Sequence, residues 1–262
     1  MKVKELFEAK ERSILSEMGK QEDPYPRIFS CSNNKLTSLE GAPSVVNGGF
    51  ACFNNNLTSL QGAPSVVKGN FTCANNKLTS LEGAPSVVKG IFYCSHNNLT
   101  SLQGAPSVVN NDFYCSNNKL TSLEGAPSAV KGDFVCSYNK LTSLEGAPSV
   151  VNNDFYCSYN KLTSLEGAPS VVKGNFSCPY NKLTSLAGIH KIIKEIHGYA
   201  DFENNPIKSS VLGLMRIKGL TKVYLDNKQV MGILNKYLKG DRDIIKCQSE
   251  LLDAGFEEFA KL

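Results

Sequence analysis

The chain has 262 residues, of which 28 are basic and 24 acidic, so its formal net charge is only +4. This composition lacks the concentrated basic charge that neutralises phosphates, so we expect no nucleic-acid partner. The N-terminal residues carry charges every few positions and no continuous apolar run, which predicts neither a secretory signal nor a membrane-spanning helix. We therefore expect a cytoplasmic protein without membrane contacts.

The first segment, residues 1–27, is predicted to be a helical cap. Its apolar side chains between residues 2 and 20 fall near one face of a helix, and Pro24 and Pro26 then lead into extended chain. These apolar residues are Val3, Leu6, Phe7, Ile14, Leu15 and Met18.

From residue 28 onward a 21-residue unit, F-x-C-x-x-N-x-L-T-S-L-x-G-A-P-S-x-V, is present in eight copies, the last of which keeps the pattern only as far as Gly188. The alternation in F-x-C places two apolar side chains on one face of a short strand. Repeats of this length stack on their neighbours, so residues 28–207 are predicted to form a repeat solenoid with a parallel sheet on its concave face. The phenylalanines are Phe29, Phe50, Phe71, Phe92, Phe113, Phe134, Phe155 and Phe176.

The return path of each coil contains G-A-P-S-x-V. Proline lacks a backbone donor and the residue before it avoids helix, which favours a mostly irregular, turn-rich convex side over α-helix. Glycine or asparagine, the residue types that most readily accept a positive φ, stands two residues before each phenylalanine after the first, so we predict left-handed turns there. These residues are Gly48, Gly69, Gly90, Asn111, Gly132, Asn153 and Gly174.

Eight of the nine cysteines follow the same 21-residue spacing. An odd count at a stacking interval favours reduced, buried thiols over a disulfide framework. Zinc sites need ligands that converge from short spacings such as C-x-x-C, which do not occur, so we expect neither a metal nor another cofactor. The spaced cysteines are Cys31, Cys52, Cys73, Cys94, Cys115, Cys136, Cys157 and Cys178.

An asparagine follows each of these cysteines by three residues. Its amide both donates and accepts, so a stacked column can satisfy the turn backbone of successive coils. The predicted ladder consists of Asn34, Asn55, Asn76, Asn97, Asn118, Asn139, Asn160 and Asn181.

The repeat resembles the leucine-rich-repeat family, whose pattern L-x-x-L-x-L-x-x-N-x-L is matched by V-x-x-x-F-x-C-x-x-N-x-L from Val130 to Leu141. Phe and Cys replace leucines, and one residue is added between Val130 and Phe134, as in short bacterial and phage variants. The resemblance implies a solenoid that binds other macromolecules.

Beyond the eighth repeat, Ala200, Phe202, Asn205 and Ile207 reproduce the repeat offsets in a degenerate ninth coil. Val223 and Leu225 suggest one further strand. Residues 227–238 and 242–261 are predicted helices, so residues 208–262 are expected to form a mainly helical C-terminal cap.

The N-terminal M-K-V-K-E-L-F-E segment, the repeats and the G-L-T-K-V-Y-L-D-N-K-Q-V stretch together resemble uncharacterised leucine-rich-repeat proteins of large tailed bacteriophages. That resemblance implies a protein acting in an infected bacterium or on the virion, and it carries no catalytic residues with it.

Side chains of the strands and of the following turn vary most between repeats, and the second half of the solenoid is rich in tyrosine and aspartate. Tyrosine is enriched in recognition surfaces, although stacked tyrosines can equally serve to stabilise the sheet. Calcium binding is disfavoured, since in-register aspartates do not offer six to eight converging oxygens. The candidate binding residues are Tyr93, Asp112, Tyr114, Asp133, Tyr138, Asp154, Tyr156, Tyr159 and Tyr180.

Three functions are compatible with this pattern. The favoured one is a non-enzymatic scaffold that binds a host or phage protein. A virion-borne adhesin for host-surface carbohydrate is the alternative, and an enzyme within residues 189–262 is the weakest, since His190, His197 and Cys247 are scattered. The sequence leaves the oligomeric state open.

Overall fold

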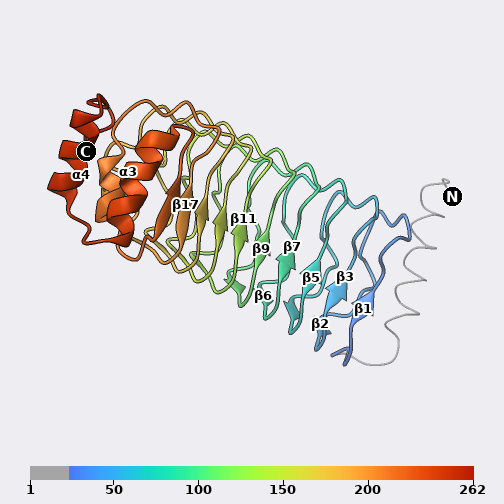
Figure 1. The fold of residues 1–262 in the computed structure, drawn as a ribbon. Helices are drawn as coiled ribbons and strands as arrows, with labels where there is room; N and C mark the ends of the chain where they lie inside the picture. Colours follow the sequence, from blue (N-terminus) through green and yellow to red (C-terminus); the bar gives the residue numbers. More distant parts are fainter. Residues whose placement is uncertain (1–23) are drawn as a thin grey trace.

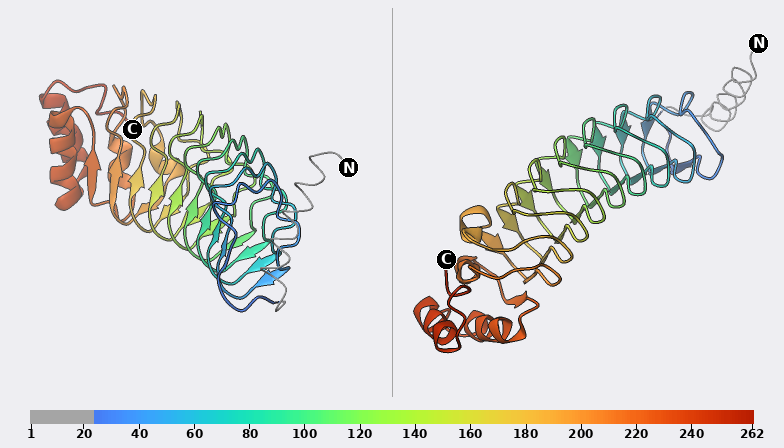
Figure 2. Two further views of the ribbon diagram at one scale, coloured as in Figure 1. Left: turned by 90° about the vertical axis from the view of Figure 1, so that its right-hand side faces the viewer. Right: turned by 90° about the horizontal axis from the view of Figure 1, so that it is seen from above.

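Each repeat contributes its phenylalanine and the next residue to one parallel sheet along a stack of about nine coils (Figure 1). The computed structural model describes residues 24–262, and the stack bends along its length (Figure 2). Pairing is in register, so that Phe113 lies opposite Phe134. The ten strands, in spatial order, are β1 (Phe29–Ser30), β3 (Phe50–Ala51), β5 (Phe71–Thr72), β7 (Phe92–Tyr93), β9 (Phe113–Tyr114), β11 (Phe134–Val135), β13 (Phe155–Tyr156), β15 (Phe176–Ser177), β17 (Tyr199–Asp201) and β18 (Lys222–Tyr224). The predicted solenoid is confirmed.

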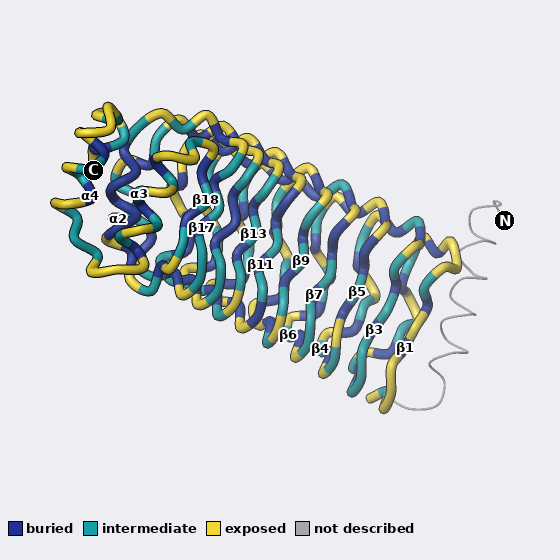
Figure 3. The backbone as a smooth tube through the Cα atoms, viewed as in Figure 1, coloured by how far each residue is buried: buried dark blue, intermediate teal, exposed yellow. Residues whose placement is uncertain are grey.

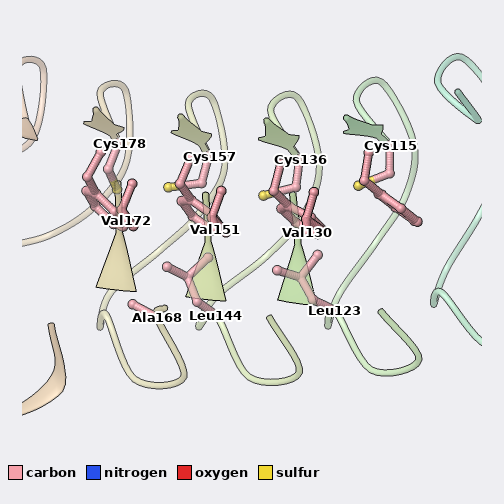
Figure 4. Packing of buried hydrophobic residues seen from close by; sticks show 14 of the residues in the cluster. Cys115, Leu123, Val130, Cys136, Leu144, Val151, Cys157, Ala168, Val172 and Cys178 are labelled. Atoms are coloured by element: carbon pink, nitrogen blue, oxygen red, sulfur yellow. The ribbon is translucent and has the colours of Figure 1, made fainter. Parts of the chain in front are cut away.

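The core is a set of columns that run from coil to coil. Each repeat buries a phenylalanine, a cysteine, two leucines and a valine, and the buried positions continue along the stack (Figure 3). Phenylalanine rings of successive repeats are stacked, with centroids 5.2 to 5.6 Å apart. Figure 4 shows the cysteine and valine columns close together inside the coils. Stacking thus gives one continuous core although each coil alone is too small to enclose one.

The return path carries extended chain, as expected, but it is more regular than the predicted irregular side. Its strands form two separate parallel sheets. One contains β2 (Val45–Val46), β4 (Val66–Val67), β6 (Val87–Val88) and β8 (Val108–Val109), and the other β10 (Ala129–Val130), β12 (Val150–Val151), β14 (Val171–Val172) and β16 (Glu195–Ile196). The break falls between β8 and β10, at the one repeat in which alanine, Ala129, replaces the first valine of the pair.

The left-handed turns lie elsewhere than predicted. None of the seven glycines and asparagines placed two residues before a phenylalanine has a positive φ; instead, the glycine of each Gly-Ala-Pro does, as does the residue before each ladder asparagine. Gly125 has φ 91° and Asn117 has φ 54°. The prediction was wrong about the cause: at Gly48 a Cβ would lie 2.5 Å from backbone atoms of Arg27, so glycine is required there by close approach of neighbouring chain.

The two ends differ in what the structure describes. The predicted N-terminal helix over residues 2–20 lies outside the described residues. At the other end the chain forms α2 (Ile189–Ile192), the 3-10 helix η1 (Leu212–Arg216), α3 (Lys228–Lys239) and α4 (Ile244–Asp253). α3 agrees with the predicted helix to within one residue, whereas α4 is shorter than predicted because the chain turns at Gly255, with φ 79°. The main sheet continues beyond residue 207, as far as Tyr224.

Helix α3 covers the outer edge of the last strand, β18. The Val223 amide donates to Asn235 Oδ1 at 2.7 Å, and Asn235 Nδ2 donates to the Val223 carbonyl at 2.9 Å. The Arg242 guanidinium donates to the carbonyls of Ile217 and Leu220. Asn235 therefore takes the place of a next strand and satisfies an edge that would otherwise be open to pairing. Within residues 24–262, no helix is long and apolar enough to cross a bilayer.

Candidate binding face

The asparagine column joins each coil to the one before it. Asn118 Nδ2 donates to the carbonyls of Cys94 at 3.2 Å and Cys115 at 3.0 Å, and its Oδ1 accepts the Leu99 amide at 3.1 Å. The same pattern recurs at Asn55, Asn76, Asn97, Asn139, Asn160 and Asn181. One buried side chain thus satisfies backbone groups of two coils.

The first and last coils show where this column begins and ends. Asn34 is exposed, and among residues 24–262 its Nδ2 donates only to the Ser32 carbonyl, at 3.1 Å, so within this part of the chain its side chain joins no two coils. Asn205 of the degenerate ninth coil completes the column, donating to the carbonyls of Cys178 at 2.9 Å and Phe202 at 3.1 Å.

The thiols of the cysteine column are unreactive. All nine thiols are free and buried, and most of those in the column donate to a carbonyl of the next coil, as Cys94 Sγ does to Tyr114 at 3.3 Å. Burial raises the pKa of Cys31 to about 12, and it also raises the pKa of Cys52 well above its usual value. The nucleophilic thiolate is therefore suppressed, and these side chains act as packing groups.

The aspartates just before the strands form a second hydrogen-bonded column. Asp112 Oδ1 accepts the Asp133 amide at 2.8 Å, Asp133 Oδ1 accepts the Asp154 amide at 3.0 Å, and Asp154 Oδ1 accepts the Asn175 amide at 2.7 Å. Asn70 and Asn175 make the same bond with an uncharged amide, to Ile91 at 2.9 Å and Tyr199 at 3.0 Å. The hydrogen bond itself therefore does not require a charge.

Strand tyrosines lie beside this aspartate column. The Tyr114 hydroxyl donates to Asp112 Oδ2 at 3.2 Å, and the Tyr156 hydroxyl donates to Asp154 Oδ2 at 2.6 Å. Partial burial, followed by the charge of Asp112, raises the pKa of Tyr114 to about 12, and burial also raises the pKa of Tyr156. Tyr93 packs against Tyr114 with ring centroids 5.2 Å apart. Both hydroxyls stay protonated at neutral pH and hold the carboxylates in place.

The central aspartate, Asp133, is expected to reduce stability at neutral pH. Partial burial and the neighbouring Asp112 and Asp154 charges raise its pKa, so the folded protein binds this proton more tightly than the unfolded chain does. The stabilisation that comes from this bound proton is thus complete at a pH below the pKa of Asp133 in the unfolded chain. It is lost as the pH rises through the pKa of Asp133 in the folded protein. Asp133→Asn should raise the free energy of unfolding at pH 7 by about 0.2–1 kcal/mol.

Thermal melts of the native protein and of Asp133→Asn at pH 7 and pH 3.5 measure this effect. The variant should melt higher at pH 7, and the difference should shrink in acid. A variant that melts lower at pH 7 would show that the carboxylate itself holds the strand start.

A separate tyrosine stack lies where the strands end. Tyr138, Tyr159 and Tyr180 are parallel, with successive centroids 4.4 and 4.2 Å apart, and 50, 41 and 45% of their surfaces are exposed. Their φ values are 57, 54 and 55°, in a region that bulky residues rarely occupy. A hydrogen bond with Tyr180 raises the pKa of Tyr159 to about 12. The stack therefore faces solvent.

The nine predicted residues thus fall into two groups on one side of the main sheet, which we call the Asp/Tyr face. The aspartates directly precede the strands, and Tyr93, Tyr114 and Tyr156 are the second residues of β7, β9 and β13. The stack of Tyr138, Tyr159 and Tyr180 follows the strand ends. Asp133 and Tyr138 are five positions apart in the chain, a distance of at most about 17 Å in extended chain.

Sequence reasoning missed the continuation of this face onto the last two strands. Tyr199 and Tyr224 meet edge to face with centroids 5.4 Å apart, and Asp201 accepts the Glu203 amide at 2.9 Å. The offsets of Ala200 and Val223 could have located these residues, because they place Asp201 and Tyr224 level with Tyr156.

Of the residues considered for catalysis, Cys247 and His197 have other surroundings or partners. Cys247 is buried in α4, which raises its pKa to about 11, and His197 Nε2 lies 3.0 Å from Glu195 Oε2. Within residues 24–262, no hydrogen bond joins either histidine to a serine or cysteine side chain, and no three metal-ligating side chains converge.

Comparison with known proteins identifies the fold. No family model matches the sequence, and no curated protein matches it. Among solved structures, YopM from Yersinia enterocolitica WA-314 is 21% identical with a TM-score of 0.53, over 70% of this chain and 39% of that chain. A Shigella effector leucine-rich-repeat domain is 22% identical with a TM-score of 0.51, over 65% of this chain and 77% of that one. The chain therefore has the leucine-rich-repeat fold, and it spans well under half of YopM.

Proposed function

We propose that the protein is a scaffold that binds another protein through the Asp/Tyr face. The observation that carries this proposal is the exposed stack of Tyr138, Tyr159 and Tyr180, which is held at left-handed backbone positions. Large rigid aromatic side chains give a partner contact area at a low cost in conformational entropy.

The left-handed backbone conformation is unfavourable for tyrosine, which indicates that Tyr138, Tyr159 and Tyr180 do more than support the fold. Asparagine tolerates the left-handed region better than tyrosine does, and it stands there in Asn33, Asn54, Asn75 and Asn117. Asparagines can also pair across coils, since Asn54 Nδ2 donates to Asn33 Oδ1 at 3.0 Å. Stacking offsets part of the strain, by about 0.5–1.5 kcal/mol per pair. The exposed ring surface is what the tyrosines add.

The fold supports the same class of function, because leucine-rich-repeat solenoids commonly act as protein-interaction scaffolds and one neighbour in structure is the leucine-rich-repeat domain of a Shigella effector. The proposal includes the compartment and origin expected from the sequence, namely the cytoplasm of a phage-infected bacterium and a host or phage protein as partner.

Affinity capture from lysate of infected bacteria tests the proposal. A triple variant with Tyr138→Asn, Tyr159→Asn and Tyr180→Asn should fold, because asparagine is the residue of other repeats at this position, and it should lose the partner. The matched control replaces Lys119, Lys140 and Lys161 with asparagine, the residue found at the same offset in Asn56 and Asn98. Equal recovery from the tyrosine variant and from the native protein would refute the proposed face.

A further inference from the structure

The Asp/Tyr face is open between the two ends of the solenoid. Helices α3 and α4 pack at the C-terminal end, and the views show no helix over strands β7 to β13 (Figures 1 and 2). The half-buried tyrosines Tyr93, Tyr114 and Tyr156 lie on the strands themselves, and the exposed stack of Tyr138, Tyr159 and Tyr180 lies beyond the strand ends. In the described part of the chain, nothing occupies this surface.

Its charge is unbalanced. Asp112, Asp133 and Asp154 directly precede three neighbouring strands, which are about 4.8 Å apart, and no ion pair among residues 24–262 involves them. Their mutual repulsion contributes to the raised pKa of Asp133, after burial. Asn70 and Asn175 supply the same backbone acceptor without charge, so the three carboxylates add repulsion that the fold does not need.

At the C-terminal end of the same sheet, lysine side chains contact a tyrosine and a carboxylate. Lys222 Nζ lies 4.3 Å from the centre of the Tyr224 ring and donates to its hydroxyl at 2.8 Å. Lys228 Nζ lies 2.6 Å from Glu203 Oε1. Ammonium groups therefore already pack against a tyrosine and a carboxylate on β17 and β18 and the segments that follow them, whereas the coils of β9 to β13 present the same two side-chain types without a lysine partner.

We infer that the partner of the Asp/Tyr face is a cationic polypeptide segment, whose lysine or arginine side chains pair with Asp112, Asp133 and Asp154 while its remaining side chains lie on the tyrosines. This inference rests on the proposed function and adds the chemical class of the partner. A nucleic acid or an anionic lipid surface would meet carboxylates and be repelled.

Fluorescence anisotropy with labelled nona-arginine as the probe tests the charge preference. The test variant carries Asp112→Asn, Asp133→Asn and Asp154→Asn, which keep the backbone acceptors. The matched control removes three charges elsewhere, by Glu124→Gln, Glu145→Gln and Glu166→Gln, at a position that the protein itself fills with Gln61 and Gln103. Both variants have the same net charge, and circular dichroism melts establish that both are folded.

We expect the aspartate variant to bind the probe at least about tenfold more weakly than the native protein, and the control to stay within about twofold of it. The native interaction should weaken as salt is raised. Equal weakening by both variants would reduce the effect to net charge and overturn the inference, as would an absence of probe binding to the native protein.

The two proposals can fail separately. If the tyrosine variant loses the captured partner while the aspartate variant retains it, the scaffold stands and the cationic segment is wrong. If the aspartate variant alone loses nona-arginine and neither variant loses the captured partner, the face binds cations but is not the scaffold surface.

Discussion

Replacing Phe134 with alanine is expected to lower the free energy of unfolding by about 3–5 kcal/mol. The ring is fully buried, and it stacks between Phe113, at a centroid distance of 5.3 Å, and Phe155, at 5.6 Å. Its loss would leave a cavity in a column where both neighbours are fixed by their own coils. Because each coil is stabilised by its two neighbours, the damage should weaken the junction between the halves of the solenoid.

Denaturant unfolding monitored by circular dichroism measures this loss. Val135→Ala is the control, since Val135 follows Phe134 in the same strand but points to the other side and is half-buried. The control should cost less than about 1 kcal/mol. A loss for Phe134→Ala no larger than that of the control would mean that the phenylalanine column does not hold the coils together.

Replacing Asn118 with alanine should cost about 1–3 kcal/mol, although it removes no charge and little apolar surface. The change leaves the carbonyls of Cys94 and Cys115 and the amide of Leu99 without their side-chain partner in a buried position. These groups cannot form hydrogen bonds with water instead, because the residues around them pack against the next coil.

The protein provides its own control at the start of the same column. Asn34 is exposed and makes a single local side-chain bond, so Asn34→Ala should change the free energy of unfolding by less than about 0.5 kcal/mol. Equal midpoints for the native protein and Asn118→Ala in the same denaturant titration would refute the bridging role of the asparagine column.

Much of the fold follows from the repeat because its residues specify columns directly. A phenylalanine and a cysteine two positions apart can share a buried face only in extended chain, and the 21-residue spacing aligns them between coils. The return sheets were not predictable in the same way, since a pair of valines is compatible with irregular extended chain until the register of neighbouring coils is known. The left-handed turns do not lie where the sequence predicts them, because the glycines two residues before the phenylalanines avoid a clash with neighbouring backbone and do not have a positive φ.

The candidate face could be predicted as a set of residues but not as an arrangement. Nothing in the sequence shows that Tyr138 follows the strand in a left-handed turn, since tyrosine disfavours that conformation. The hydrogen bonds from Asp112 to the next coil depend on the separation between coils, which only the structure supplies. Asp201 was overlooked because the ninth coil departs from the 21-residue interval.

The gap between the two return sheets has a mechanical consequence. No backbone hydrogen bond joins residues 107–110 to residues 128–131 in the described chain, whereas the main sheet is continuous past this point. Bending of the rod is therefore expected to concentrate there, with the main sheet as the pivot and the two blocks of coils moving as rigid bodies. The junction separates the coil of Asp112, which follows β8, from the coil of Asp133, which follows β10, so such flexing would change the spacing between these two carboxylates while leaving that between Asp133 and Asp154 unaltered.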